Sequence, residues 1–137
     1  MIVMDANLML VSAVKDDRQE SVLEQFEQWI TPGIVWHAPN LARYEAANGL
    51  IRLIVAGKVS KAEAEASWDD ISLLPITYHP IMNGRRVLEI VLQMKWQSAY
   101  DATYIALDEA LGAELWTLNS PLYRNATSLG FPVKLLT

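Results

Sequence analysis

Short apolar runs alternate with helical stretches along the whole chain of 137 residues. The runs favour β-strands, and the stretches between them carry apolar residues at helical spacing. Strands that are separated by helices form parallel units with right-handed crossovers. The alternation therefore predicts an α/β fold, a three-layer α/β/α sandwich around a central parallel sheet of about five strands. The expected strands are residues 1–4, 34–38, 75–80, 115–118 and 133–136.

The helical stretches carry start and stop signals. Ser60 and Glu63 form a capping-box pattern at the start of one helix. Gly112 is a natural residue to follow the end of another helix, and Pro121 suits the first turn of a short last one. The expected helices are residues 6–14, 19–30, 39–56, 60–74, 82–94, 98–111 and a short segment from 120.

Length and composition fit one folded domain over residues 1–137. Apolar residues make up 52% of the chain and charged residues 20%, which excludes a disordered protein. There is no cysteine, so we expect no disulfide, no thiolate metal site and a cytoplasmic location. We also expect no signal peptide and no membrane span. A net charge of −5 means that binding a phosphate backbone would need a local basic patch or bound cations.

Acidic residues lie where the expected strands end. Asp5 ends the first strand, Glu45 lies early in the helix after the second, and Asp101 lies in the first turn of the sixth helix. Because the carboxyl ends of parallel strands share one edge of the sheet, we expect these three carboxylates to converge there. Asn119 follows the fourth strand, and Ser120 is expected to cap the next helix, which leaves the Asn119 amide for the same site.

The helix that carries Glu45 is expected to have two faces. Glu45, Asn48 and Arg52 form a polar stripe. Beside it lies an expected apolar stripe of Tyr44, Ala47, Leu50, Ile51 and Ile54. For Asp5 itself the structural alternative is a helix N-cap, a position that Asp favours.

The acidic cluster predicts a site for a hard cation. Neighbouring carboxylates repel one another unless cations neutralise them. Oxygen ligands without cysteine suit Mg²⁺ or Mn²⁺, which keep waters and bind substrate phosphates. The chemistry of such sites is in-line attack of a metal-activated water on a phosphodiester.

Four segments around these residues follow one another in a familiar order and spacing. They are residues 4–7 (MDAN), 44–48 (YEAAN), 100–107 (YDATYIAL) and 112–119 (GAELWTLN). Together they resemble the PIN domain, and most closely the VapC toxins of bacterial and archaeal toxin–antitoxin pairs. The resemblance covers the whole chain, and the segment around Asp101 is its most specific part.

The resemblance implies an Mg²⁺- or Mn²⁺-dependent endoribonuclease that acts on RNA, forms a homodimer and is neutralised by a small antitoxin protein. Matched position by position, Asp5, Glu45 and Asp101 would bind the metal and, with Asn119, form the catalytic site. Most members have a fourth acid where this chain has Asn119, so one negative charge is missing and a second metal ion is in question. Asn7 and Asn48 are expected as supporting polar residues.

Five other polar residues are considered for RNA binding, for metal binding or acid-base chemistry, or for a structural role. Arg85 and Arg86 are the best local basic pair for an RNA backbone. His37 and His79 both lie near strand ends; such a pair could bind Zn²⁺ or act as acid and base, although strand-end histidines are more often only hydrogen-bonded. Asp108 falls two turns beyond the acid of its own helix and is expected to be structural.

The five tryptophans could belong to the core or to an interface with a partner protein. Core packing accounts for them, and the alternative is an interface, where tryptophan is enriched. We expect an antitoxin helix to bind in a hydrophobic groove between early helices, using Trp29 and Leu23.

Three alternative functions fit less of the sequence. A phosphatase of the haloacid dehalogenase type would want a carboxylate at position 7, which is Asn7. A receiver domain would need an acid pair before its phosphorylated Asp and a lysine at the same edge. A non-catalytic, PIN-like protein-binding module stays open because of Asn119 and the tryptophan content.

Overall fold

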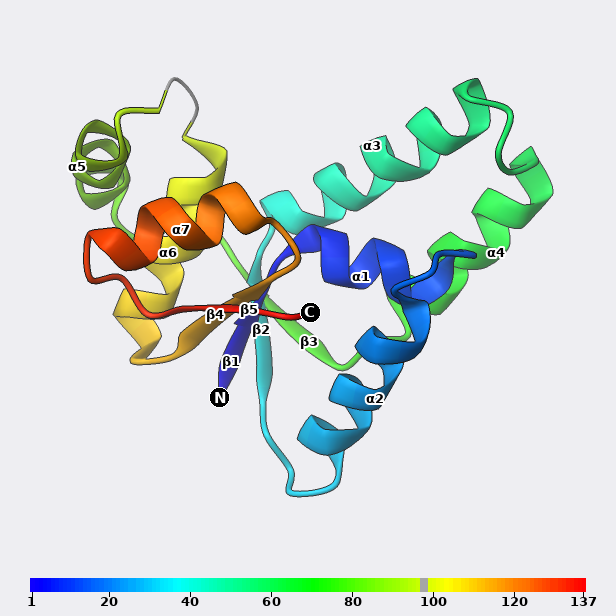
Figure 1. Ribbon diagram of the computed structural model, residues 1–137, viewed down its shortest axis with the longest axis horizontal. Coiled ribbons are helices and arrows are strands. Elements are labelled where there is room, and N and C mark those ends of the chain that lie inside the picture. Colours follow the sequence, from blue (N-terminus) through cyan, green and yellow to red (C-terminus); the bar gives the residue numbers. More distant parts are fainter. Residues whose placement is uncertain (97–98) are drawn as a thin grey trace.

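Five parallel strands form one sheet, in the order β3-β2-β1-β4-β5 (Figure 1). The computed structural model describes residues 1–96 and 99–137. The strands are β1 Ile2–Met4, β2 Trp36–Pro39, β3 Ile76–His79, β4 Glu114–Thr117 and β5 Val133–Leu135. Every pair of neighbours is parallel, which confirms the predicted sandwich with a parallel central sheet.

Helices cover both faces of this sheet. They are α1 Ala6–Ala13, α2 Gln19–Ile30, α3 Leu41–Val55, α4 Lys61–Ser72, α5 Gly84–Met94, α6 Tyr100–Leu111 and α7 Ser120–Ser128. The first four group on one side, with α1 packed against α2, α3 and α4. On the other side α6 lies across β1, β2 and β4, with α5 beside it and α7 against β4 and β5.

Most helix signals act as the sequence predicts. The Ser60 and Glu63 side chains each accept the other's backbone N–H, at 3.0 and 3.1 Å, and so form the predicted capping box. Gly112 ends α6 with a φ of 64°, a conformation that costs glycine little. The predicted start of α6 at Ser98 lies outside the described residues.

Several element starts are later than predicted: α3 begins at Leu41, because Pro39 is the last residue of β2, and the starts of β2 and α5 have local causes. The second strand begins at Trp36, because Ile34 donates its N–H to the carbonyl of Trp29 and so belongs to the turn after α2. Helix α5 begins at Gly84, because the side chain of Asn83 accepts the N–H of Arg86 and caps it.

The predicted apolar stripe of α3 only partly faces the core. The buried residues of this helix are Ala42, Ala46, Gly49 and Leu50. A Cβ at Gly49 would lie 2.5 Å from Cδ2 of Leu10, so α3 packs closely against α1 there and a larger residue would require the Leu10 side chain to move. Small residues therefore face the core, and Tyr44 and Ile51 are 70% and 56% exposed.

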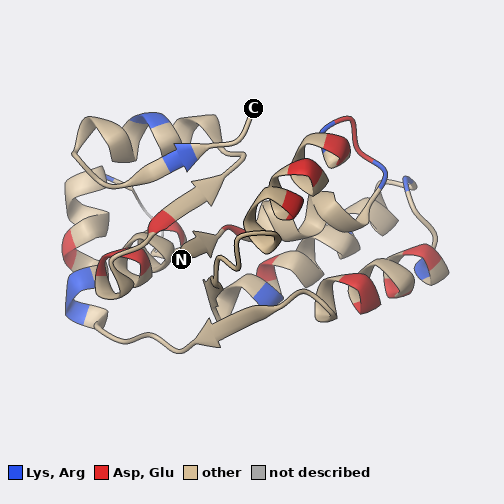
Figure 2. Cartoon of the chain, turned by 90° about the horizontal axis from the view of Figure 1, so that it is seen from below, with Lys and Arg blue, Asp and Glu red and all other residues tan. Residues whose placement is uncertain are grey.

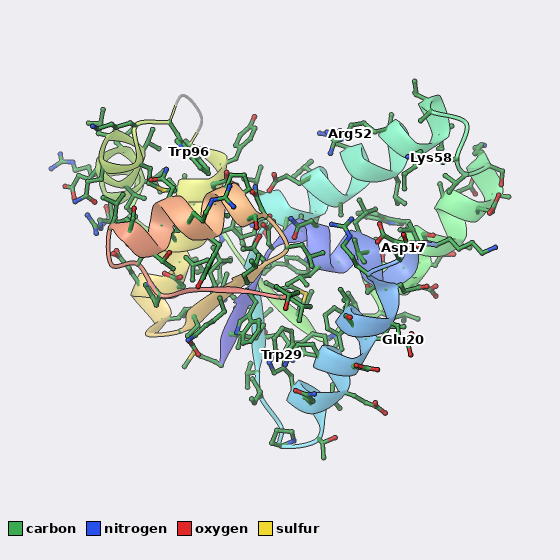
Figure 3. The ribbon with its side chains drawn as sticks, viewed as in Figure 1. Asp17, Glu20, Trp29, Arg52, Lys58 and Trp96 are labelled. Atoms are coloured by element: carbon green, nitrogen blue, oxygen red, sulfur yellow. The ribbon has the colours of Figure 1, made fainter. Side chains whose placement is uncertain are left out.

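The tryptophans mainly pack the core between α2 and the sheet. Trp29 contacts Trp36 and Trp116 edge-on, with ring centroids 5.9 and 5.3 Å apart, and Phe26 lies 4.8 Å from Trp36. Figure 3 shows Trp29 between α2 and the strands. Since Trp29 is only 4% exposed, its predicted role in a partner groove is wrong.

Two surface properties, membrane-spanning character and the distribution of charge, follow from the helices. Within the described ranges, no helix combines the length and the apolar character that a membrane span needs. Figure 2 shows acidic residues on several helices and the fewer Lys and Arg scattered among them, in line with 16 acidic and 11 basic residues.

Candidate active site

Three carboxylates from distant parts of the chain influence one another at the carboxyl edge of the sheet. Asp5 follows β1 directly, Glu45 lies in the second turn of α3, and Asp101 lies in the first turn of α6. The charges of Asp101 and Glu45 both raise the pKa of Asp5, and Glu45 also raises the pKa of Asp101. The fold therefore places the three acids in one electrostatic cluster.

Asp5 is the most buried member of the cluster. It is 7% exposed, and burial raises its pKa to about 7 against the opposing effect of a hydrogen bond from Thr117. The Thr117 hydroxyl donates that bond to Oδ2 of Asp5 at 2.7 Å. Asp5 stands at the N-cap position of α1 without a full side-chain capping bond, but the backbone N–H of Asn7 also lowers its pKa, so a capping contribution and a place in the site are compatible.

Glu45 is held by a buried tyrosine. The Tyr104 hydroxyl donates a hydrogen bond of 2.6 Å to Oε1 of Glu45, and Tyr104 is fully buried. Burial raises the pKa of Tyr104 well above 10, so it remains a donor at neutral pH. Tyr104 lies three residues after Asp101, so both face the site from the same side of α6.

Asp101 is partly buried, and burial followed by the charge of Glu45 raises its pKa to about 6. Sequence reasoning did not single out Thr117 or Tyr104. Their positions were the available signal, because Thr117 ends a strand on the same edge and Tyr104 is one helical turn from Asp101.

The predicted capping at Asn119 and Ser120 is wrong. Asn119 occupies the N-cap position, and its Oδ1 accepts the N–H of Leu122 at 3.1 Å. Its backbone is extended, with φ −85° and ψ 100°, as an N-cap requires, whereas Ser120 is already helical. The amide oxygen is therefore engaged in the helix. Asn119 is still linked to the acids, because its N–H donates to the Thr117 hydroxyl at 3.0 Å.

The two supporting asparagines differ. Oδ1 of Asn7 accepts a long hydrogen bond of 3.5 Å from the N–H of Leu118, which ties α1 to the end of β4 beside the acids. Asn48 is exposed on α3, one turn beyond Glu45. Only Asn7 therefore braces the site in this structure.

Arg86, one of the two adjacent arginines predicted to bind RNA, is engaged in ion pairs. Arg86 makes a bidentate ion pair with Glu109, at 2.7 and 2.8 Å, and a further bond to Glu89 at 3.1 Å. This engagement argues against the predicted RNA contact of Arg86, whereas Arg85 is exposed. Asp108 is fully buried, and burial raises its pKa to about 8, which agrees with a structural residue.

The donor set fits a hard cation. The three acids offer only carboxylate oxygens, and burial, followed by the charges of neighbouring acids, raises the pKa values of Asp5 and Asp101, so a cation would favour their ionised forms. In the part of the chain that the structure describes, no group of three or more His, Asp or Glu side chains is placed so that it could hold a metal ion.

Comparison with known proteins shows similarity to ribonucleases. No protein-family model matches the chain. It is 30% identical over 118 residues to "VapC ribonuclease Mb0985" of Mycobacterium bovis, covering 85% of this chain and 84% of that protein. It is 28% identical over 136 residues to "Ribonuclease VapC3" of Pyrobaculum aerophilum, covering 96% and 98%.

A solved structure supports the fold. The chain superimposes on Mycobacterium tuberculosis VapC20, described as a "Sarcin-Ricin loop cleaving toxin", with a TM-score of 0.71 over 96% of both chains. The sequence identity is 14%, so this likeness concerns the architecture alone.

Proposed function

This chain belongs to the VapC family of PIN-domain ribonucleases, and we propose that it is a toxin that cleaves RNA internally with the help of Mg²⁺ or Mn²⁺. We propose further that residues 1–137 act as one PIN-like domain. The observation that carries the proposal is the electrostatic cluster of Asp5, Glu45 and Asp101 on the carboxyl edge of the sheet.

Each acid has a separate part in this proposal. Asp5 Oδ2 and Glu45 Oε1 are held by Thr117 and Tyr104, so their second oxygens and the carboxylate of Asp101 are the groups that would hold the cation. When bound, the cation supplies a Lewis acid that activates a water for attack on a phosphodiester. The chain's own contribution is to fix these oxygens and to keep Asp5 out of bulk water.

The hydrogen bonds around the acids explain how the site stays rigid. The Asn119 N–H donates to Thr117, and Thr117 donates to Asp5, so the start of α7 and the end of β4 fix one side of the cluster. Tyr104 fixes the other side through Glu45. Partners of this kind orient metal ligands in well-studied sites.

The proposed partners follow from the family. The substrate is RNA, the assembly is a homodimer, and a small antitoxin protein blocks the site. An apolar groove between α3 and α4 supports the antitoxin role, because exposed apolar side chains such as Ile51 and Trp68 line it. Its apolar lining residues are Ala47, Leu50, Ile51, Ile54, Ala64 and Trp68.

The test is cleavage of a mixed RNA pool by the purified protein, with Mg²⁺, with Mn²⁺ and with a chelator. We expect cleavage only with metal, and its loss in Asp5→Asn and Asp101→Asn. A matched control is Asp17→Asn, an exposed acid outside the cluster. Cleavage at full strength in either cluster variant would refute the site. Metal binding without cleavage of any RNA would favour the non-catalytic PIN-like binding module.

A further inference from the structure

The two histidines of the chain are in contact on the sheet. His37 is the second residue of β2 and His79 the last of β3, and Pro39 is the register partner of His79. Side chains two residues apart on a strand share a face, so both imidazoles lie on the same face of neighbouring strands. Nδ1 of His37 and Nε2 of His79 are 2.9 Å apart, with ring centroids at 5.0 Å and ring planes tilted by 41°.

This separation suits two kinds of interaction. In a hydrogen bond, one ring donates its N–H and the other accepts with its lone pair. In a metal site, both nitrogens offer lone pairs to one ion at about 2.0 Å, and ligands at a right angle are then about 2.8 Å apart. A tetrahedral ion would require about 3.3 Å. The observed 2.9 Å is a hydrogen-bond distance, and it lies closer to the right-angle separation of Cu²⁺ and Ni²⁺ than to the tetrahedral one, so a turn of the rings would bring both lone pairs onto one ion while the strands stay in place.

The surroundings favour a neutral imidazole at His37 and leave both rings within reach of an ion. Both residues are partly exposed. Burial, the charge of His79 and the N-terminal ammonium all lower the pKa of His37, which keeps its lone pair available. The electrostatic contacts of the three acids are with one another, so the histidine pair is a separate site with nitrogen donors.

We propose that His37 and His79 form a second cation site, which takes a divalent ion that prefers imidazole nitrogen and right-angle coordination, with Cu²⁺ or Ni²⁺ as the matching ions. The acidic cluster and the histidine pair would bind different cations, since carboxylate oxygens favour Mg²⁺ or Mn²⁺ and imidazole nitrogens favour later transition metals. The inference is independent of RNA cleavage.

The experiment uses the intact, metal-free protein at about pH 8, above the ordinary pKa of a free imidazole. One equivalent of Cu²⁺ is added, and pulsed electron paramagnetic resonance counts the imidazole nitrogens on the ion. The chain contains 2 histidines, so every imidazole signal comes from this pair. We expect two imidazoles on one Cu²⁺ per chain, in the wild type and in the Asp5→Asn, Asp101→Asn double variant.

The variants separate coordination from a hydrogen bond. His37→Gln and His79→Gln keep a side chain that can hydrogen-bond and should each lose one imidazole signal, whereas the control Thr77→Gln, next to His37 in the strand register, should keep both. Circular dichroism and metal-free melting check that each variant folds. Wild-type NMR adds a measurement without substitution, since Cu²⁺ should broaden the ring signals of both histidines together. One imidazole or none on the wild-type ion would overturn the proposal.

Discussion

The hydroxyl of Tyr104 donates a hydrogen bond of 2.6 Å to Oε1 of Glu45, across two helices that lie on opposite sides of the sheet. Tyr104 is fully buried, so water cannot replace this bond when it is lost. The contact therefore fixes the orientation of a carboxylate that α3 alone would leave free to rotate.

We predict that Tyr104→Phe weakens metal binding while the fold is kept. Phenylalanine fills the same space, but Oε1 of Glu45 loses its donor. Loss of such a supporting hydrogen bond typically costs about 10–100-fold in metal affinity. Titration with Mn²⁺, followed by calorimetry, measures the effect apart from cleavage. Tyr44→Phe, on an exposed tyrosine of the same helix as Glu45, is the control and should change nothing. Equal Mn²⁺ affinity in wild type and Tyr104→Phe would show that the bond does not position Glu45.

The metal-free protein should lose stability as the pH rises from about 4 to about 7. Burial raises the pKa of Asp5 from 3.8 to about 7, and burial together with Glu45 raises that of Asp101 to about 6. The folded state then binds more protons than the unfolded chain in this window, so the free energy of unfolding falls as pH rises. The stabilisation is complete below pH 3.8 and is lost above about 7. For Asp5 it amounts to roughly 4 kcal/mol at most.

Urea unfolding between pH 4 and 8, with a chelator present, measures this dependence. Asp5→Asn removes the charge and should flatten part of the curve, while Asp17→Asn should leave it unchanged. Asp108 contributes in the same direction, since burial raises its pKa to about 8, and so some slope should persist in Asp5→Asn. Saturating Mg²⁺ should raise the stability most at pH 7 and above. A curve for Asp5→Asn that parallels the wild type would contradict the placement of Asp5 in the cluster.

Strand and helix order were predictable because each signal is local. The bounds of α2, the capping box at Ser60 and the end of α6 at Gly112 all depend on residues within one turn of one another. The convergence of the acids was also predictable, because parallel strands bring their carboxyl ends to one edge.

The features that could not be predicted from the sequence depend on tertiary contacts. The face of α3 that meets the core includes the close contact between Gly49 and Leu10. A hydropathy pattern does not predict such a contact. The Tyr104–Glu45 and Thr117–Asp5 bonds join residues that are 59 and 112 positions apart. Between Asn119 and Ser120, two residues that both favour N-caps, the backbone conformation decided.

The exposed side of α3 leads to a prediction about the antitoxin. Ile51 is 56% exposed and Trp68 36% exposed, and both line the groove between α3 and α4. We predict that Ile51→Asp abolishes binding of the antitoxin, because a charge in an apolar groove is desolvated without a partner. RNA cleavage by the free protein should be unchanged.

Where a small protein is encoded next to the chain's own gene, co-expression of the two followed by purification of the complex measures that binding. Leu73→Asp is the matched control, since Leu73 is 82% exposed and does not line the groove. A complex that survives Ile51→Asp would place the antitoxin elsewhere.

The last prediction concerns Asn119. Its Oδ1 caps α7, and its N–H is linked through Thr117 to Asp5, so the residue stands one hydrogen bond away from the acids. Aspartate caps helices as well as asparagine does, so Asn119→Asp should keep α7 and add only a negative charge beside the cluster. Asn119→Ser keeps the cap without the charge and is the matched control.

A fourth negative charge should have two opposite effects. It should lower the concentration of Mg²⁺ or Mn²⁺ at half-maximal cleavage, because a further carboxylate attracts the cation. It should also lower the melting temperature of the metal-free protein, because the new charge repels Asp5 and Asp101. Titration of wild type, Asn119→Asp and Asn119→Ser, with RNA cleavage and melting followed together, tests both effects. If the metal curves of all three proteins superimpose, the side chain at position 119 serves only to cap α7 and lies outside the metal site.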